Sequence, residues 1–163
     1  MYSTKLEVVN ACIATMGEAP LNSLEEEHVY KQAALDYLSG SNKALQKKGW
    51  WFNKEIMKLL PDATSKFIYL PQNTLEAERA DERDPVFAQR GRRLYDPILN
   101  RYEWEHELYP QVIVELNFED LPYHAQDAVA LSAILRFQQR VRRTGWQRGC
   151  CRGRASCLQS ARS

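Results

Sequence analysis

The sequence has little of what enzyme chemistry usually requires, with three histidines and four cysteines among 163 residues. It contains no phosphate-binding loop, no dinucleotide-binding glycine fingerprint and no G-x-S-x-G motif. His28, His106 and His124 have no second histidine or cysteine at the spacing of a metal site. No apolar run approaches the roughly 18 to 20 residues that would span a bilayer, and the first residues lack the layout of a secretory signal. We therefore expect a soluble, intracellularly made protein that is not an enzyme, with no cofactor and no membrane partner.

The four cysteines divide into two groups. Cys12 lies in an apolar helical stretch, where a cysteine acts as a small buried hydrophobe. Cys150, Cys151 and Cys157 follow one another as C-C-x5-C, which matches no usual zinc pattern and has no histidine nearby. Intracellular synthesis also argues against structural disulfides.

Charge is distributed unevenly along the chain, although the formal net charge is only +1. Seven of the 22 basic residues lie from Arg140 onward, where there is no acidic residue, so 21 acidic residues face 15 basic ones before that point. An acidic body argues against a dedicated nucleic-acid-binding domain, whereas a basic tail could contact phosphate or an acidic protein. A solvated tail is the simpler interpretation of those arginines.

Helical patterns occupy both ends of the chain. Thr4 and Glu7 form a capping box before the first apolar stripe, and Gly17 stands where a left-handed cap belongs. A second helix is predicted over residues 25–48, with Glu25, Glu26 and Glu27 in its first turn, and Gly49 closes it. A third helix is predicted from Leu121-Pro122 to residue 144. We expect the three helices to pack together.

"GWWFN", which begins at Gly49, places three large aromatic side chains directly after the second helix. So much aromatic surface could form a hinge of the core, a partner surface or a ligand platform. Because the chain must turn back there, we expect Trp50, Trp51 and Phe52 to form an aromatic joint between helical and β layers.

The middle of the chain has the short period of strands. Residues 55–60, 66–70 and 111–118 are predicted strands, and residues 86–89 and 92–95 flank a hairpin turn at Arg90-Gly91. Residues 73–84 and 96–109 are polar and bounded by prolines, which favours exposed loops.

These elements predict an α+β fold that is mainly α, because there is no alternating βαβ order. We expect a helical bundle from residues 1–53 and 119–145, a small antiparallel β insertion over residues 54–118, and an atypical, disordered basic tail over residues 146–163.

Two polar clusters are candidates for function. Arg90, Arg92 and Arg93 form a basic hairpin tip that could contact DNA or a partner, as could Arg140, Arg142 and Arg143, while a solvated turn is the alternative for the hairpin. Glu105-His106-Glu107 is the sharpest acid/base cluster, but adjacent side chains point in different directions and favour an exposed loop. A small nucleic-acid-binding module that uses the arginine hairpin and the basic tail is the second functional hypothesis.

Five segments in one order resemble the tail tubular protein A family of short-tailed bacteriophages. They are "VVNACIATMGEAPLNSL", "ALQKKGWWFN", "KLLPD…FIYLP", "RGRRLYD" and "VIVELNFEDLP…AILRFQ". The resemblance covers roughly residues 6–143. It implies a virion structural protein of the phage tail, made in the bacterial host cytoplasm: a head-to-tail adaptor whose dodecameric ring binds portal and tail nozzle and surrounds the DNA channel.

The sequence departs from that family after Arg143. The family continues with a helical segment rich in alanine and glutamate, whereas "GWQRGCCRGRASCLQSARS" has three glycines, three cysteines and no acid. We hypothesise a frameshifted or degraded prophage copy, whose docking element would be lost. The encoding nucleotide sequence tests this hypothesis, since a shifted frame should restore an Ala/Glu-rich helix.

Overall fold

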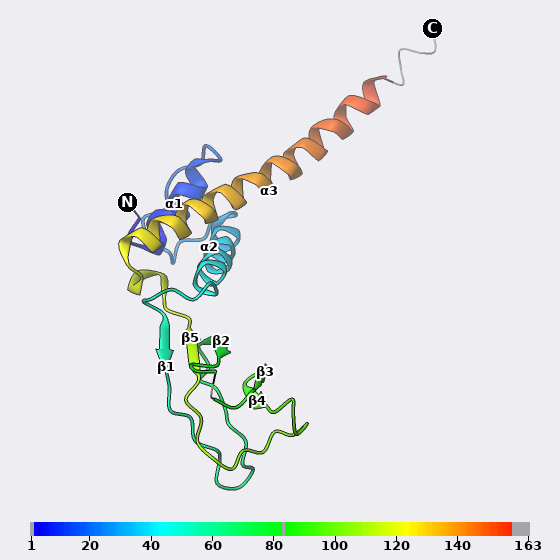
Figure 1. The fold of residues 1–163 in the computed structure, drawn as a ribbon. Helices are drawn as coiled ribbons and strands as arrows, with labels where there is room; N and C mark the ends of the chain where they lie inside the picture. The colour runs from blue at the N-terminus through cyan, green and yellow to red at the C-terminus, as the bar shows by residue number, and fades with distance from the viewer. Residues whose placement is uncertain (1, 83, 158–163) are drawn as a thin grey trace. The chain divides into compact units, whose positions relative to one another are not determined.

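The chain divides into two compact units in a computed structural model that describes residues 2–82 and 84–157, with side chains as far as residue 141. The helical unit consists of Met1–Asn42 and Tyr123–Ser163, and the β unit is Lys43–Pro122. Figure 1 shows the elements in chain order. They are α1 (Lys5–Ala14), α2 (Lys31–Gln46), β1 (Lys54–Ile56), β2 (Thr74–Glu78), β3 (Ala88–Arg90), β4 (Arg93–Tyr95), β5 (Gln111–Val114), a 3-10 turn η1 (Phe118–Asp120) and α3 (Tyr123–Cys157).

The first helix begins as its sequence predicts. The Thr4 hydroxyl accepts the backbone N–H of Glu7 at 3.3 Å, and the Glu7 carboxylate accepts the backbone N–H of Thr4 at 3.2 Å, so the capping box is confirmed. Backbone N–H groups of Ser3 and Thr4 hold the pKa of Glu7 below its ordinary value. Gly17 has φ of +76°, which confirms the left-handed position after the helix.

The second helix begins later than we predicted. It starts at Lys31 rather than near residue 25, and its first turn contains no acidic residue. Glu25, Glu26 and Glu27 lie instead in an exposed turn before it. The helix-dipole explanation for these three carboxylates is therefore wrong, because they are outside the helix.

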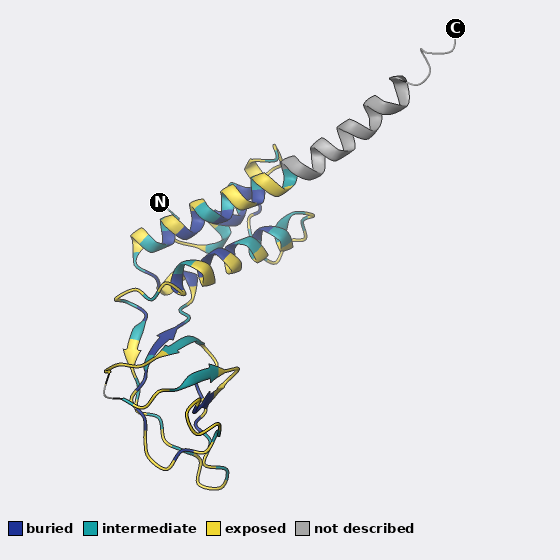
Figure 2. Cartoon of the chain, turned by 45° about the vertical axis from the view of Figure 1, so that its right-hand side comes forward, coloured by how far each residue is buried: buried dark blue, intermediate teal, exposed yellow. Residues whose placement is uncertain are grey.

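The three helices pack together, as expected. The core of the helical unit contains Val9, Cys12 and Ile13 from α1, Ala34 from α2 and Phe137 from α3. Burial raises the pKa of the Cys12 thiol to about 11, so this cysteine is a core side chain and a poor nucleophile. Figure 2 shows the alternation of buried and exposed positions along the helices.

For residues 146–163, the predicted basic tail, the structure describes the backbone as far as residue 157. Helix α3 continues to Cys157, beyond residue 144 where we predicted its end. Residues 158–163 lie outside the described residues, and no side chain is described from residue 142 onward. The altered tail and its frameshift origin remain predictions.

The β unit has two small antiparallel sheets. β5 is the central strand of the first, in the order β1-β5-β2, because it pairs with β1 on one edge and with β2 on the other. Val112, Ile113 and Val114 of this strand are buried. β3 and β4 form the second sheet, whose last pair, Arg90 with Arg93, encloses Gly91 at φ of +64° and confirms the predicted hairpin. The prediction of a loop over residues 73–84 is wrong for the part that forms β2.

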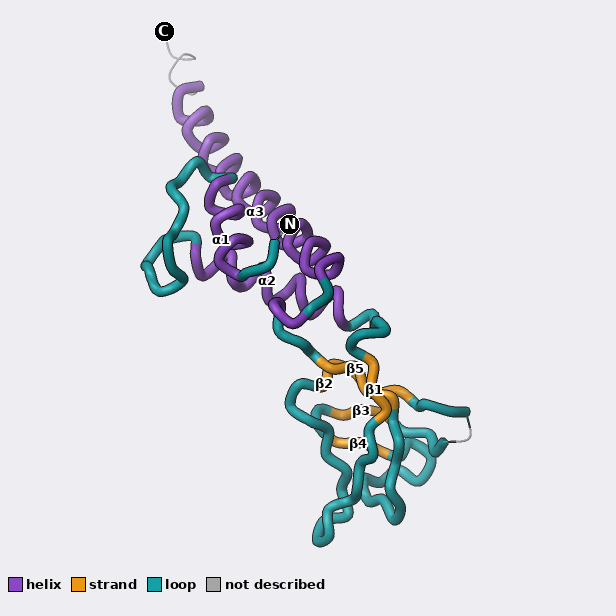
Figure 3. Tube along the Cα trace, turned by 90° about the vertical axis from the view of Figure 1, so that its left-hand side faces the viewer, coloured by secondary structure: helices purple, strands orange, loops and turns teal. Residues whose placement is uncertain are grey.

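Loops make up much of the β unit, as Figure 3 shows, and they also supply part of its core. Trp104 and Leu108 are buried, although residues 96–109 were predicted to be exposed. The Trp104 Nε1–H group donates to the carbonyl oxygen of Leu94 at 3.2 Å, which lets the indole lie inside. The core members are Ile68, Leu70, Leu94, Trp104, Leu108, Val112 and Val114.

The prediction of a mainly α fold is wrong. The described residues form a mixed α+β fold with three α-helices and two antiparallel sheets, and the β unit has a hydrophobic core of its own. Five of its seven buried residues lie in segments that we predicted as strands, whereas Trp104 and Leu108 lie in the predicted loop of residues 96–109, which has no strand pattern. Among the described helices, none combines the length and apolar character required to cross a membrane.

Candidate interaction surfaces

Glycine is required at the first position of the "GWWFN" motif. Gly49 has φ of +68°, and a Cβ atom there would lie 2.9 Å from Cδ1 of Ile113 in β5. Both the backbone angle and the close approach exclude larger side chains. Gly49 therefore ends α2 and lets the chain pass directly over the sheet.

Asn53, the last residue of the motif, is the centre of a buried hydrogen-bond network. Its Oδ1 accepts the backbone N–H of Trp50 at 2.7 Å, and its Nδ2 donates to the carbonyl oxygens of Gln46 at 2.9 Å and Val114 at 3.2 Å. The side chain is completely buried. One amide thus joins the end of α2, the following turn and the central strand.

Gln46 completes this network, which we call the amide staple (Gln46, Asn53 and the backbone of residues 114–116). Its side-chain amide accepts the backbone N–H of Leu116 and donates to the Leu116 carbonyl oxygen, both at 2.8 Å. Gln46 is also completely buried. Our sequence analysis missed this network. Its signal is the pair of amide side chains Gln46 and Asn53, seven positions apart, one at the end of a predicted helix and the other shortly after the glycine that follows it.

The three aromatic side chains lie outside the staple. Trp51 is 82% exposed, Trp50 is 42% exposed and Phe52 is half-buried. Trp50 stacks on Phe52 at 6.4 Å, Trp51 meets Phe52 edge-on at 5.6 Å, and Trp50 Nε1–H donates to the carbonyl oxygen of Leu45 at 2.9 Å. The tight turn that Asn53 closes on Trp50 directs these side chains outward, so amides rather than aromatics fill the interior at this point.

The arginine hairpin is held on aromatic rings. The Arg90 guanidinium carbon lies 3.5 Å from the centre of the Tyr95 ring, and that of Arg93 lies 4.9 Å from the Tyr102 ring. A side-chain hydrogen bond with Tyr102 raises the pKa of Arg90 above its ordinary value. Arg92 instead donates from Nε and Nη2 to the carbonyl oxygen of Leu70, at 3.3 and 3.1 Å. Arg90 and Arg93 are therefore the two that keep a pre-oriented, exposed guanidinium.

The other sequence-predicted arginines are not brought to this hairpin by any described contact. Arg140 donates from Nη1 to the Tyr37 hydroxyl at 3.3 Å, within the helical unit. The side chains of Arg142 and Arg143 lie outside the described residues.

A rigid loop with two exposed aliphatic side chains follows β4. Asp96 Oδ1 accepts the backbone N–H groups of Ile98 and Leu99 at 2.8 and 3.0 Å, and the Asn100 Oδ1 accepts the Tyr95 hydroxyl at 3.0 Å. Ile98 is 69% exposed and Leu99 is 57% exposed. We call this loop, residues 96–101, the aliphatic knob.

The cluster Glu105-His106-Glu107 has a structural explanation. Glu107 lies 2.8 Å from Lys58 Nζ and accepts the Tyr109 hydroxyl at 2.6 Å, and the Lys58 hydrogen bond holds the pKa of Glu107 below its ordinary value. Glu105 pairs with Arg101 at 3.4 Å. Within the residues described, no group of three His, Cys, Asp or Glu side chains could hold a metal ion.

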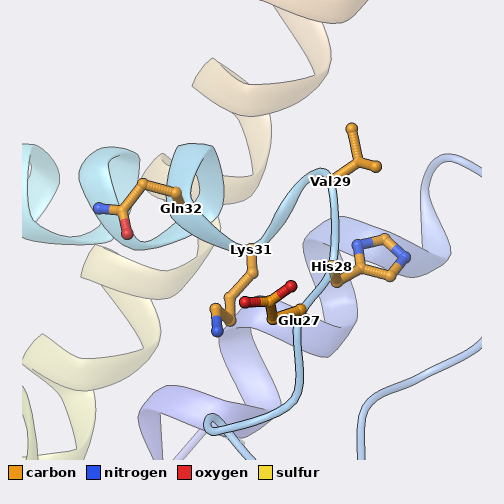
Figure 4. Close-up of a pocket in the computed structure, with 5 residues that line it drawn as sticks. All are labelled: Glu27, His28, Val29, Lys31 and Gln32. Carbon is orange, nitrogen blue, oxygen red and sulfur yellow. The ribbon is translucent and has the colours of Figure 1, made fainter.

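A shallow hollow of about 600 Å³ lies on the helical unit, where the turn before α2 enters the helix. Its lining residues are Glu27, His28, Val29, Lys31 and Gln32. His28 and Val29 lie on the loop and Gln32 on the first turn of α2, as Figure 4 shows. The His28 Nδ1 accepts the backbone N–H of Tyr30 at 3.2 Å.

The comparison with known protein families gives one decisive match. The family model described as tail tubular protein matches residues 6–147. The chain belongs to the tail tubular protein family. Among curated relatives, this tail tubular protein is 27% identical to "Tail tubular protein A" of Klebsiella phage KP34 over 126 residues, which cover 77% of this chain and 67% of that relative. It is thus a structural component of a phage tail and not an enzyme.

Proposed function

We propose that this tail tubular protein is the adaptor subunit that joins the portal to the tail nozzle. In this proposal it is made in the host cytoplasm and assembles as a dodecameric ring around the passage of the genome. The family match and the order of the five sequence segments support the proposal. Exposed apolar side chains on both units support it as well, since a ring subunit offers two different patches to its neighbours.

The exposed aromatic pair is the single observation that carries the proposal. Trp51 exposes 82% of its surface beside the half-exposed Trp50, although the same unit buries Trp104 almost completely. Exposed apolar clusters of this kind mark protein interfaces, and tryptophan is among the residues that contribute most to binding. In this proposal Trp50 and Trp51, which we expected to lie between the helical and β layers, form a contact between subunits.

A second apolar patch lies on a different element. Leu131 and Leu135 are 54% and 56% exposed, and at positions i and i+4 they occupy one face of α3. This spacing supports contact with another subunit or with a tail component along the helix.

Assembly on a portal ring tests the proposal. Purified chain, mixed with the portal ring of its own phage, should give a complex whose mass by native mass spectrometry exceeds that of the portal by a closed ring of copies. Trp51→Ser should raise the chain concentration for half-maximal occupancy about thirtyfold, as for a hot spot worth about 2 kcal/mol. Trp51→Phe, which keeps an aromatic face, is the matched control and should retain most of the binding. A wild-type chain that leaves the portal mass unchanged would overturn the adaptor assignment.

Genomic DNA should slide through the ring with little adhesion. The acidic body supports this, because few phosphates are neutralised where acids outnumber bases. We expect the assembled ring to bind duplex DNA no more tightly than about 10⁻⁴ to 10⁻⁶ M at physiological salt, the range of non-specific binding. Nanomolar binding that weakens when Arg90 and Arg93 are both changed to Gln would favour the nucleic-acid-binding module instead.

A further inference from the structure

We propose that the aliphatic knob of one copy, together with Arg90 and Arg93, docks into the hollow beside Glu25–Val29 of a second copy of this chain. This inference rests on the proposed ring function and names one of its subunit contacts. Each copy carries both halves, so the contact is heterologous and can be repeated around a closed ring.

The knob is prepared for binding before it meets a partner. Asp96 fixes the backbone of Ile98 and Leu99, and the backbone N–H and carbonyl groups of Asp96 and Arg101 are paired at 2.9 and 3.3 Å. Asn100 has φ of +54°, held by its hydrogen bond to Tyr95. Little conformational entropy remains to be lost on docking, which favours binding.

The two arginines next to the knob are equally well ordered. Stacking on Tyr95 and Tyr102 covers one face of each guanidinium, while both side chains remain exposed. Tyr102 and Tyr95 themselves contact each other at 4.9 Å, so the arginines and the knob belong to one rigid surface. Arginine and tyrosine beside exposed aliphatic groups is the composition of an interface rather than of a solvated turn.

The turn that leads into the hollow carries the complementary charge. Glu27 lines the hollow, and Glu25 and Glu26 directly precede it in the chain. All three glutamates are exposed, lie outside α2, and in the part of the chain that is described form no ion pair. Lys31, the nearest cation on the rim, donates from Nζ to the carbonyl oxygen of Glu26 at 2.8 Å. Guanidinium groups pair with carboxylates through two parallel hydrogen bonds when geometry allows, so Arg90 and Arg93 are suited to these glutamates.

The hollow also offers an apolar contact. Val29 is 89% exposed at its edge, the largest exposed fraction among the large hydrophobic side chains described. The hollow is open and shallow, and its volume of about 600 Å³ leaves room for two aliphatic side chains. The contact is small compared with the roughly 1,200 Å² of a stable interface, so it should form weakly in free solution and strongly where copies are held together.

Disulfide cross-linking tests this contact without a portal. The chain with Cys150, Cys151 and Cys157 changed to Ser, and carrying Ile98→Cys and Val29→Cys, should give a ladder of intermolecular disulfides under mild oxidation at high protein concentration. The yield should be about ten times the yield of a matched chain with Ile98→Cys and Ser39→Cys. Ser39 is the control position because it is exposed but lies outside the hollow. Equal yields, or a disulfide within one copy only, would overturn the inference.

Charge exchange gives an independent readout. Arg90→Glu with Arg93→Glu should lower the cross-linking yield about tenfold, as should Glu25→Arg with Glu27→Arg. The chain with all four changes should recover it, because opposite charges face each other again. Far-UV circular dichroism verifies folding of each variant, and failure of the four-change chain to recover while folded would contradict the contact.

The two proposals fail separately. If the chain cross-links but does not assemble on the portal, the proposed contact is supported and the proposed adaptor function is wrong. If the charge-reversed variants assemble normally on the portal, the adaptor function is supported and the proposed contact is wrong.

Discussion

Asn53→Leu should lower the free energy of unfolding of the β unit by about 3 to 5 kcal/mol. Leucine has nearly the same size, but it removes the buried partner of the Trp50 N–H group and of the Val114 carbonyl oxygen. The Gln46 carbonyl oxygen loses one of its two donors and keeps the N–H of Gly49. Each buried polar group left unsatisfied costs about 1 to 3 kcal/mol. Urea unfolding followed by tryptophan fluorescence measures the loss, since three of the four tryptophans lie in this unit.

Asn117→Leu is the matched control for this experiment. Asn117 is an exposed asparagine of the same unit whose side chain donates to Asp120 at 3.2 Å on the surface. Its replacement should change stability by no more than about 0.5 kcal/mol. Equal effects of the two substitutions would show that the amide staple does not hold the β unit together.

Phe137→Ala should destabilise the helical unit by about 3 to 5 kcal/mol, the usual cost of removing a buried phenylalanine. Phe137 is 1% exposed and meets the Tyr30 and Tyr37 rings edge-on at 6.1 and 6.2 Å. Removal of the ring leaves a cavity among all three helices and ends both aromatic contacts. Thermal unfolding followed by circular dichroism at the helical band reports this loss.

Leu135→Ala tests whether burial is the cause. Leu135 lies two residues away on the same helix and is 56% exposed, so its truncation should cost less than about 1 kcal/mol in the free chain. A loss at Leu135 as large as that at Phe137 would mean that the exposed face of α3 is already covered in the isolated protein.

Local signals in the sequence predicted the local structure well. The capping box of α1, the left-handed Gly17, the cap at Gly49 and the hairpin between β3 and β4 are confirmed. The strand predicted over residues 111–118 is confirmed for its first half, β5. Each of these features depends on residues that are close together in the chain, such as a helix and the glycine with positive φ that follows it. The sequence was equally informative for family membership, because five segments in order are a specific signal.

Features that depend on distant partners could not be predicted. Trp50 and Trp51 have the composition of a core, but the tight turn closed by Asn53 decides that they point outward. Conversely, Trp104 has polar neighbours in sequence and is buried, because its indole N–H finds a carbonyl oxygen ten residues earlier. The three glutamates before α2 resemble the acidic first turn of a helix until the helix is seen to begin at Lys31.

The amide staple has a topological consequence. Gln46 lies where the chain enters the β unit and Leu116 lies shortly before it leaves, and two hydrogen bonds of 2.8 Å join them across seventy positions. A salt bridge of 3.6 Å between Lys43 and Glu115 joins the same two segments of the chain. The two ends of the β unit are thus joined by hydrogen bonds. A relative can therefore lengthen, shorten or replace the chain between Gln46 and Leu116 without a change in the helices before and after it.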